Sequence, residues 1–302
     1  MYDVIILGAG PAGLSAAVYA KRARLNALLI EKGGAGGQVL STYEVDNYPG
    51  LPGVTGMELG QIFSQHADKF GIEKVTAEVI AIDAGKDKKI VKTNQGDYET
   101  AAVVIATGAK HARLGLDKES ELTGMGVSYC ATCDGAFYKD AEVAVVGGGD
   151  VAIEDAIFLA RGCKKVYLIH RRDELRGAKA LQETLFALPN VEVIWDSAVR
   201  EIEGEDEVTG IRVANVKSGE ERNLPVEGLF IAVGIIPNSE AFEGLVSMDK
   251  GGYIVAGEDC KTDIAGIFAA GDVRTKPLRQ IVTAAADGAN AIYSVQEYLI
   301  HG

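Results

Sequence analysis

The sequence predicts an α/β protein in which one βαβ-containing domain is inserted into another of the same kind. Two glycine-rich motifs, GAGPAG at 8–13 and GGGDVA at 147–152, each follow an apolar strand and precede a helical pattern. The segments 8–32 and 147–171 have the same length without gaps, so the chain contains an internal repeat. The length of 302 residues, 47% of them hydrophobic, is typical of about two domains with substantial cores.

Apolar runs predict the strands of each repeat. Residues 4–7 and 27–30 flank the first helix, and residues 143–146 and 166–169 flank the second. In such a unit the first glycine permits a tight turn and the second lets the backbone approach a pyrophosphate, while a small third residue allows close helix–strand packing. The helix N-terminus supplies N–H groups and a positive dipole to the phosphates. Each repeat is therefore expected to be a Rossmann-like, dinucleotide-binding domain.

The two repeats differ in charge after their second strand. Glu31, followed by Lys32, ends the first, where a carboxylate accepts hydrogen bonds from a ribose 2′-hydroxyl and repels a 2′-phosphate. In the second repeat, the residues expected at the ribose edge are His170, Arg171, Arg172 and Arg176. Because arginine binds phosphate through charge-assisted bidentate bonds, we expect FAD in the first domain and NADPH, preferred over NADH, in the second.

Three further apolar strands end in glycine turns and complete the domains. They are expected within residues 102–108, 229–234 and 267–273. Asp272 at the end of the last strand can bond a ribityl hydroxyl of a flavin. The helix expected from 278 to 299 would direct its N-terminus at the pyrimidine end of the flavin.

These elements predict a discontinuous layout. Residues 1–111 and 240–302 are expected to form the FAD-binding domain. Residues 112–239 are expected to form the inserted NADPH-binding domain, which also carries the cysteine pair described below.

The expected ligand residues follow from these positions. Those for FAD are Gly8, Gly10, Pro11, Ala12, Glu31, Lys32, Gly37, Gln38, Asn47, Val79, Ala106, Thr107, Gly108, Gly271, Asp272, Arg279, Gln280 and Ile281. Those for NADPH are Gly147, Gly149, Asp150, Val151, His170, Arg171, Arg172, Arg176, Val233 and Gly234. For Asn47, a surface loop without a ligand is an equally good interpretation.

A Cys-x-x-Cys pair, Cys130 and Cys133, lies just before the second fingerprint. In such a motif one thiol has a lowered pKa and attacks a disulfide, and the carboxyl group of Asp134 is placed to move a proton during exchange. A zinc site requires four ligands, and the sequence lacks partners for this pair, so no metal is expected. Cys163 and Cys260 are isolated and are expected to be core residues.

Composition argues against several classes of protein. The formal net charge of −13 disfavours nucleic acid as a partner. The sequence has no run of 18 or more apolar residues, so no membrane span is expected. The N-terminal residues do not resemble a secretory signal, and the expected location is the cytoplasm, where a close cysteine pair indicates redox chemistry rather than a disulfide scaffold.

Along its whole length the chain resembles the low-molecular-weight thioredoxin reductases. The shared motifs are GAGPAG at 8–13, GGQ at 36–38, ATG at 106–108, CATCDG at 130–135, GGGDVA at 147–152, HRRDELR at 170–176, AAGDV at 269–273 and Arg279–Gln280. Asp150–Val151 departs from the family, which usually has an Asn/Asp–Ser/Thr pair there.

The resemblance implies a homodimer that holds FAD without covalent linkage and reduces a thioredoxin or thioredoxin-like protein. It also implies that Cys133 lies nearest the flavin, that Cys130 attacks the thioredoxin disulfide and that Asp134 is the acid–base residue.

The layout also predicts a movement. The dithiol and the nicotinamide site lie on the inserted domain and both must reach the flavin, so this domain is expected to rotate about its two crossings.

Four other functions fit the same fold. A relative reduced by ferredoxin would lack the arginine cluster, and a flavoprotein that serves a peroxidase-type partner usually has an extra N-terminal disulfide domain. A dithiol oxidase would consume oxygen without NADPH, and a redox sensor has no positive feature in the sequence.

Overall fold

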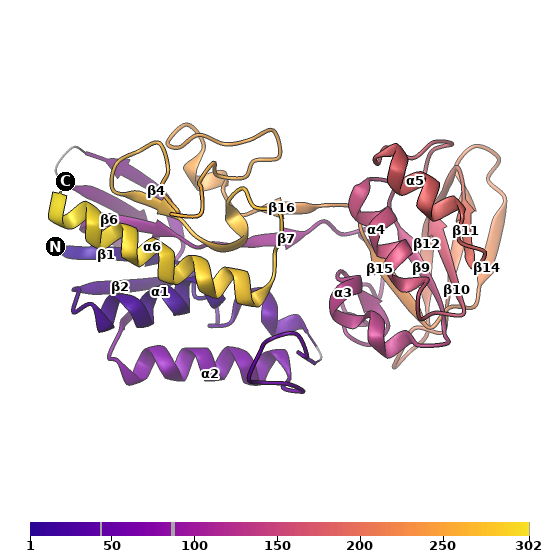
Figure 1. Cartoon of the computed structure of the whole chain (residues 1–302), viewed down its shortest axis with the longest axis horizontal. Coiled ribbons are helices and arrows are strands. Elements are labelled where there is room, and N and C mark those ends of the chain that lie inside the picture. Colours follow the sequence, from indigo (N-terminus) through magenta and orange to yellow (C-terminus); the bar gives the residue numbers. More distant parts are fainter. Residues whose placement is uncertain (43, 86–87, 302) are drawn as a thin grey trace. The chain divides into compact units, whose positions relative to one another are not determined.

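The computed structural model describes residues 1–42, 44–85 and 88–301, which form two compact units (Figure 1). Unit 1 contains residues 1–110 and 236–302, and unit 2 contains residues 111–235. The segments that connect them, β7 (Ala109–His111) and β16 (Ile235–Pro237), pair with each other as a two-stranded sheet. The chain thus passes between the units after residues 110 and 235. The layout expected from the sequence places these two boundaries after residues 111 and 239.

A mixed sheet forms the centre of unit 1. The parallel strands are β3 (Glu73–Thr76), β2 (Ala27–Glu31), β1 (Tyr2–Leu7) and β6 (Gly96–Ile105), in that order, with β17 (Ile267–Ala269) also paired to β6. The antiparallel strands β5 (Lys89–Thr93) and β4 (Val79–Ala84) continue the sheet from β6. Leu7 is in register with both Ile30 and Ile105, and Ile105 is in register with Ala269. The carboxyl ends of β1, β2, β6 and β17 therefore share one edge.

Helices cover one face of this sheet. Helix α1 (Pro11–Arg22) and helix α6 (Ile281–His301) lie side by side over it (Figure 1), and their apolar residues form a core with Val4 and Ile6. Ile5 and Leu7 point to the opposite face and pack with residues such as Phe242 and Ile254. Because both faces of β1 are covered, its sequence is a continuous apolar run.

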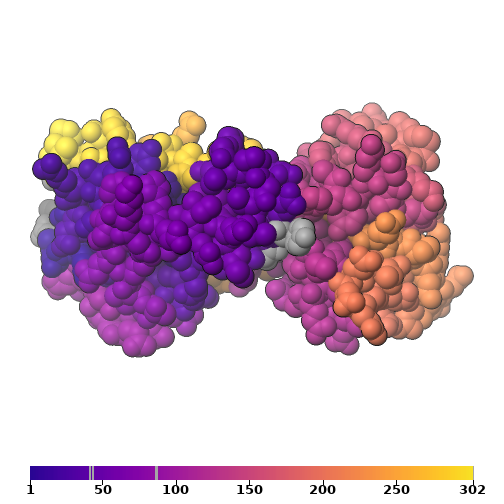
Figure 2. Space-filling view, turned by 90° about the horizontal axis from the view of Figure 1, so that it is seen from below, coloured from indigo at the N-terminus to yellow at the C-terminus, as the bar shows by residue number. Residues whose placement is uncertain are grey.

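Helix α2 (Gly56–Lys69) lies along the face of unit 1 that Figure 2 presents. It begins with a capping box, in which Thr55 Oγ1 accepts a hydrogen bond from the Glu58 N–H and the Glu58 carboxylate accepts one from the Thr55 N–H. The described part of this unit also contains the short 3-10 helices η1 (Gly37–Ser41), η3 (Glu240–Phe242) and η4 (Gly271–Val273).

Unit 2 is built around a parallel sheet. The strand order is β11 (Val191–Ile194), β10 (Lys165–Ile169), β9 (Glu142–Val146), β15 (Gly228–Ile231) and β8 (Val127–Ser128). Its helical segments are α3 (Ala131–Asp134), η2 (Gly135–Tyr138), α4 (Asp150–Leu159) and α5 (Lys179–Phe186). A separate antiparallel sheet contains β12 (Ser197–Glu203), β13 (Gly210–Asn215) and β14 (Glu221–Leu224).

In both sequence repeats the two expected strands are confirmed, and so is the helix that connects them, α1 in the first repeat and α4 in the second. Helix α6 begins at Ile281, three residues after the expected start at 278. The delay has a local cause, because the Thr283 hydroxyl accepts a hydrogen bond from the Gln280 N–H (3.1 Å) and also lies within bonding distance of the Leu278 carbonyl (3.1 Å). These contacts hold residues 278–280 in an irregular segment before the helix. The sequence analysis did not foresee β3 to β5 or β12 to β14.

Candidate functional site

In unit 1, the first fingerprint turns strand β1 directly into helix α1. Gly8 has a φ of 102°, and a Cβ at this position would lie 2.4 Å from the Ala106 carbonyl oxygen. Helix α1 starts with Pro11, and Gly10 at its N-cap has no side chain to bond the first N–H groups. Such N–H groups attract phosphate oxygens. The turn is therefore suited to an anion, with Ala12 in the first turn of the helix.

Glu31 lies beside this turn at the end of β2. Its Oε2 accepts a hydrogen bond from the Ala9 N–H (2.7 Å), and its Oε1 accepts one from the Gly33 N–H (2.8 Å). The two bonds orient the carboxylate while leaving lone pairs on both oxygens. This arrangement suits the hydroxyls of a ribose and disfavours a phosphate. Lys32 follows directly on the exposed side.

Asp272 lies in turn η4, at the same edge of the sheet. The residue is half-buried, but its Oδ1 atom is buried and has no hydrogen-bond partner among the described residues. Burial raises the pKa of this carboxyl group. A buried acceptor of this kind suits a hydroxyl donor on a ligand. The Arg279 guanidinium lies over the Tyr253 ring, 4.0 Å from its centroid.

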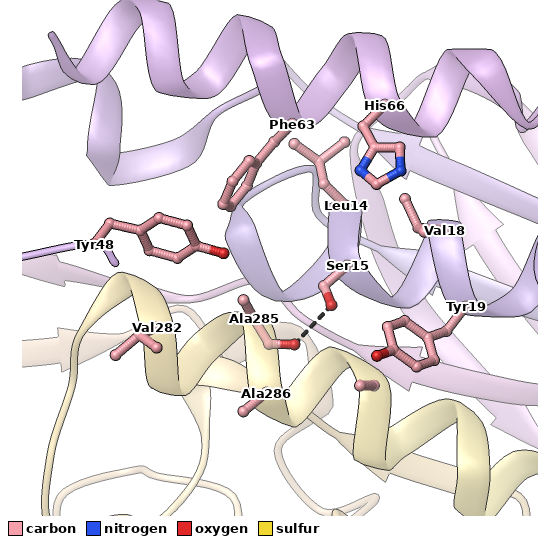
Figure 3. A pocket seen from close by; sticks show the side chains of 11 residues that line it. Leu14, Ser15, Val18, Tyr19, Tyr48, Phe63, His66, Val282, Ala285 and Ala286 are labelled. Atoms are coloured by element: carbon pink, nitrogen blue, oxygen red, sulfur yellow. Dashed lines mark hydrogen bonds between the residues drawn. The ribbon is translucent and has the colours of Figure 1, made fainter. Parts of the chain in front are cut away.

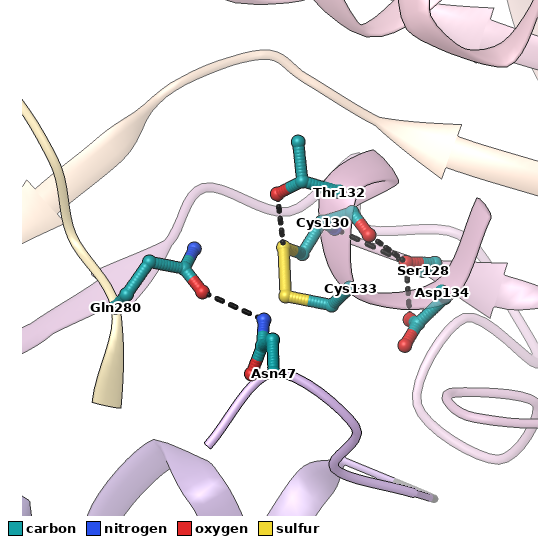
Figure 4. Close-up of a disulfide and its surroundings, with 7 residues drawn as sticks. All are labelled: Asn47, Ser128, Cys130, Thr132, Cys133, Asp134 and Gln280. Atoms are coloured by element: carbon teal, nitrogen blue, oxygen red, sulfur yellow. Dashed lines mark hydrogen bonds between the residues drawn. A yellow bond between two sulfur atoms is a disulfide. The ribbon is translucent and has the colours of Figure 1, made fainter. Parts of the chain in front are cut away.

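Two loops of unit 1 meet at the start of helix α6. The Asn47 amide donates a hydrogen bond to Gln280 Oε1 (3.0 Å), as Figure 4 shows. Gly37 packs against the first fingerprint, because a Cβ on it would lie 3.1 Å from Gly10 Cα. The structure thus joins Asn47 and Gln280, which are far apart in sequence. Asn47 lies in a loop, and its side chain bonds a second residue that was expected to bind FAD.

The remaining residues expected at this site occupy several elements. Ala106, Thr107 and Gly108 follow β6, and the Thr107 hydroxyl donates to the Asn238 carbonyl (2.6 Å). Val79 begins β4, close in sequence to Ala77, whose N–H bonds the Glu31 carbonyl (3.0 Å). The structure also places Gln38 in turn η1 and Ile281 at the first position of α6.

In unit 2, the second fingerprint repeats the geometry of the first. A Cβ on Gly147 would lie 2.4 Å from the Ala232 carbonyl oxygen, the same distance as for Gly8. Helix α4 starts at Asp150 after an N-cap glycine, Gly149. Its N-terminus is another site where N–H groups face a turn suited to phosphate.

The arginine-rich loop folds back onto this turn through two hydrogen bonds that its backbone N–H groups donate. The Arg176 N–H donates to the Gly148 carbonyl (2.7 Å), and the Ala178 N–H donates to Asp150 Oδ1 (2.7 Å). The side chains of Arg171, Arg172 and Arg176 are all exposed. Asp150 therefore positions the arginine loop, a role that the sequence analysis did not assign to it.

His170 is the only expected ligand of the described ribose edge whose side chain is buried, at 4% exposed. Its ring fills the space beneath Gly148, where an added Cβ would lie 2.2 Å from the ring. Burial lowers the pKa of His170, so a neutral imidazole packs under the turn. Val151 and Val233 are exposed at 57% and 40%, and Gly234 follows them at the edge of the unit.

Cys130 and Cys133 form a disulfide at the start of helix α3 (Figure 4). The N–H groups of Cys133 and Asp134 both donate to the Cys130 carbonyl, at 3.2 and 3.1 Å. Thr132 Oγ1 lies 3.4 Å from Cys130 Sγ. Both cysteines are half-buried, which keeps the disulfide partly accessible.

Ser128 connects the dithiol to its acid. Its hydroxyl lies 2.6 Å from Asp134 Oδ2, to which it donates, and it accepts a hydrogen bond from the Cys130 N–H (3.1 Å). Burial raises the pKa of Asp134 and the Ser128 hydrogen bond lowers it, with a net increase. Asp134 therefore retains a proton to a higher pH than an exposed aspartate, as a proton donor to a thiolate requires.

Glu119 stabilises the segment that precedes the dithiol. Its buried carboxylate accepts hydrogen bonds from the N–H groups of residues 114–116, at 2.8 to 3.2 Å, and from the Tyr129 hydroxyl (2.7 Å). Tyr129 directly precedes Cys130. Glu119 and Ser128 are functional candidates that the sequence analysis missed, because no motif or periodic pattern indicates which of the nearby groups a polar side chain bonds.

Cys163 and Cys260 are buried core residues, as expected. Burial raises the pKa of Cys163 to about 11 and that of Cys260 to about 12, so neither thiol ionises readily. None of the described helices is long and apolar enough to cross a membrane.

Comparison with known proteins identifies the family. The model of the pyridine nucleotide-disulphide oxidoreductases matches residues 2–288. The thioredoxin reductase of Listeria monocytogenes is 47% identical over 300 residues, covering 99% of this chain and 94% of the relative. The chain belongs to the thioredoxin reductases.

Solved structures of thioredoxin reductases are also similar to this chain over its full length. That from Streptococcus pyogenes is 45% identical, covers 100% of this chain and 99% of its own, and has a TM-score of 0.96. That from Lactococcus lactis, in its FR conformation, is 40% identical, covers 100% of both chains and has a TM-score of 0.69. The resemblance inferred from the motifs is confirmed, as is the fold class of two Rossmann-like domains, the NADPH domain inserted into the FAD domain.

As a thioredoxin reductase, the protein uses FAD and NADPH. The geometry of unit 1 fits FAD, because it combines an uncapped helix N-terminus, the oriented Glu31 carboxylate and the buried acceptor of Asp272. The geometry of unit 2 fits NADPH, because a second uncapped helix N-terminus lies next to a loop with three exposed arginines.

Removing two of these arginines should reduce the selectivity for NADPH. We expect Arg171→Ala with Arg172→Ala to raise the KM for NADPH by about tenfold or more and to change the KM for NADH little, since only NADPH carries the 2′-phosphate. Steady-state kinetics with each nucleotide measures this. The matched control is Arg161→Ala with Arg200→Ala, which removes two exposed arginines of the same unit outside the loop. An equal loss for both nucleotides would contradict the assignment.

Proposed function

We propose that this protein reduces the disulfide of a thioredoxin or thioredoxin-like protein with electrons from NADPH. The observation that carries the proposal is the half-buried Cys130–Cys133 disulfide beside Asp134, a half-buried acid with a raised pKa, in a chain 47% identical to a thioredoxin reductase. In this proposal residues 1–111 and 240–302 form the FAD-binding domain, and residues 112–239 form the NADPH-binding domain.

The chemistry at the dithiol balances over one cycle. FAD, when bound, would supply the disulfide with two electrons that come from NADPH. The Cys130–Cys133 disulfide takes up these electrons and two protons and becomes a dithiol. The Cys130 thiolate then attacks the partner disulfide and releases one partner thiolate. The Cys133 thiolate attacks Cys130 Sγ, releases the second partner thiolate and restores the disulfide. Asp134, with its raised pKa, supplies a proton during exchange.

The residues proposed for each cofactor are those expected from the sequence. In unit 1, Glu31 would accept from ribose hydroxyls and Asp272 from a ribityl hydroxyl. In unit 2, Arg171, Arg172 and Arg176 would bind the 2′-phosphate. His170 is proposed to support the turn from beneath rather than to reach the ribose, because its ring is buried under Gly148.

Substitution of one cysteine should separate the two half-reactions. Cys130→Ser should leave the flavin reducible by NADPH, yet turnover of a thioredoxin disulfide should fall to background because no attacking thiolate remains. An anaerobic titration followed by flavin absorbance measures the first reaction, and thioredoxin reduction measures the second. Cys163→Ala is the control, since that thiol is buried in the core. Substantial turnover in Cys130→Ser would contradict the proposal, and a flavin that NADPH fails to reduce would favour ferredoxin or small thiols as the donor.

We further propose that unit 2 rotates relative to unit 1 between half-reactions. Hydrogen bonds border the two connecting strands. On the unit 1 side Asn238 Nδ2 donates to the Thr107 carbonyl (2.9 Å), and on the unit 2 side the Ala112 N–H donates to the Gly234 carbonyl (2.9 Å). These contacts support a pivot within β7 and β16. The solved relatives also support movement, because two full-length matches of 45% and 40% identity have TM-scores of 0.96 and 0.69.

A covalent lock tests the rotation. Joining the two units with a photocleavable cross-linker should abolish turnover while one half-reaction continues. Light should then restore turnover. A cross-linked enzyme that turns over at the rate of the untreated protein would exclude the rotation. Cross-linker attached to only one unit serves as the control for chemical modification.

We propose that the protein is a cytoplasmic homodimer. Unit 1 has an apolar groove between α1, α2 and α6, drawn in Figure 3. Leu14, Val18 and Phe63 line it, and the Ser15 hydroxyl donates to the Ala285 carbonyl (2.6 Å) at its base. Neighbouring apolar side chains are exposed, with Tyr19 at 49% and Val282 at 42%. A second copy of the chain would cover this face, as the family resemblance implies.

The mass in solution tests the dimer. Light scattering should give about twice the 31.8 kDa of one chain. Val282→Asp should halve that mass, because it introduces a charge at the groove. Val255→Asp is the matched control, since Val255 is similarly exposed, at 46%, in the same unit. A monomeric wild-type protein would rule out this proposal.

A further inference from the structure

A buried cluster of charged side chains lies next to turn η4. Asp287 of helix α6, Arg274 and Lys276 have side chains that are only 6%, 7% and 4% exposed. Ionised groups are rarely buried unless they are paired, because desolvation is costly. None of the roles described above explains why three of them are buried here.

The Asp287 carboxylate accepts four hydrogen bonds. Arg274 donates from Nε to Oδ2 (2.8 Å) and from Nη2 to Oδ1 (2.7 Å), and Lys276 Nζ donates to Oδ2 (2.9 Å). The fourth donor is the backbone N–H of Gly271, at 2.9 Å from Oδ2. Burial alone would raise the pKa of Asp287, but the bonds from Arg274 and Lys276 outweigh it and lower the pKa. The carboxylate is therefore ionised and is bonded directly to the first residue of turn η4.

The cluster also connects the turn to the rest of unit 1. Arg274 Nη1 donates to the carbonyls of Ala256 (3.2 Å) and Thr275 (2.9 Å). Cys260 Sγ lies 3.4 Å from the Asp287 carbonyl. Through these contacts two segments of the chain, residues 256–260 and 271–276, are held to helix α6 around Asp287.

Turn η4 and helix α6 both meet the first fingerprint at Ala12. A Cβ on Gly271 would lie 2.8 Å from the Ala12 Cβ, and a Cβ on Gly288 would lie 2.2 Å from the Ala12 carbonyl oxygen. Gly288 directly follows Asp287. The N-terminus of α1, the turn that carries Asp272 and the helix that carries Asp287 are thus in close contact, and a small displacement of one shifts the others.

We propose that Asp287, together with Arg274 and Lys276, is a positioning residue for FAD. Its bond to the Gly271 N–H holds the turn so that Asp272 points its buried oxygen at the ribityl chain while α1 presents its N–H groups to the pyrophosphate. The two cations keep the carboxylate ionised at this position. The inference rests on the proposed placement of FAD along Glu31, the first fingerprint and Asp272.

The affinity of the apoprotein for FAD tests this role. Asp287→Asn removes the charge that orders both cations, and we expect the dissociation constant of FAD to rise by at least about tenfold. Titration of apoprotein with FAD, followed by flavin absorbance, measures it. The affinity of unit 2 for NADP⁺ should stay at the wild-type value. Asp263→Asn is the matched control, since Asp263 is an exposed carboxylate of unit 1 that bonds Ser247.

A second variant covers the case in which Asp287→Asn does not fold. Replacing the whole cluster by apolar side chains of similar size, Arg274→Met with Lys276→Met and Asp287→Leu, avoids unpaired buried charges. It still removes the bond to Gly271, so FAD should again bind at least about tenfold more weakly. The melting temperature of the holoprotein should fall more than that of the apoprotein.

Two results would overturn the inference in different ways. Wild-type FAD affinity in either folded variant, with apo and holo melting temperatures that fall equally, would show that the cluster only stabilises the fold. Asp272→Ala, measured in parallel, tests the premise. Wild-type affinity in that variant would mean that FAD is not bound at this turn, and the placement of the cofactor would fail with it.

Discussion

Close backbone contact at the two strand–helix turns is the constraint on which the rest of this structure depends. In each unit the first fingerprint glycine leaves no room for a side chain, because a Cβ would lie 2.4 Å from a carbonyl oxygen of the neighbouring strand end. The contact sets the start of helices α1 and α4 at the carboxyl edge of their sheets. As a result, the uncapped N–H groups of both helix N-termini face a position that a phosphate can occupy. The other residues expected to bind the nucleotides lie around these two helix N-termini.

Similar turns serve different nucleotides because the adjacent charges differ. Glu31 is held by two backbone N–H groups and places a carboxylate beside the first turn. The equivalent His170 is buried beneath the second turn, and exposed arginines take over the edge. Asp150 holds that arginine loop through the Ala178 N–H. Selectivity therefore depends on how each loop is folded as well as on which residue occupies one position.

The dithiol depends on polar groups that surround a short helix. Ser128 bonds both the Cys130 N–H and the Asp134 carboxyl group, and burial raises the pKa of that acid. Glu119 fixes Tyr129, the residue before Cys130. On the other unit, Asp287 is proposed to play a comparable part for FAD. In both units an oxygen acceptor outside the motifs bonds backbone N–H groups of the segment that carries the reactive residues.

The sequence by itself determined the repeat, its strands, the cysteine pair and the difference in charge between Glu31 and the arginine loop. These features are local, since the spacing of glycines and apolar residues reports the βαβ unit directly. Only the tertiary structure decided that Asn47 bonds Gln280, that His170 is buried, and which donors bond the side chains of Glu119 and Asp287 and which acceptor the Ser128 hydroxyl bonds. Contacts between segments far apart in the chain leave no periodic signal. A polar residue in a loop or helix has the same local pattern whether it faces water or fills a buried network.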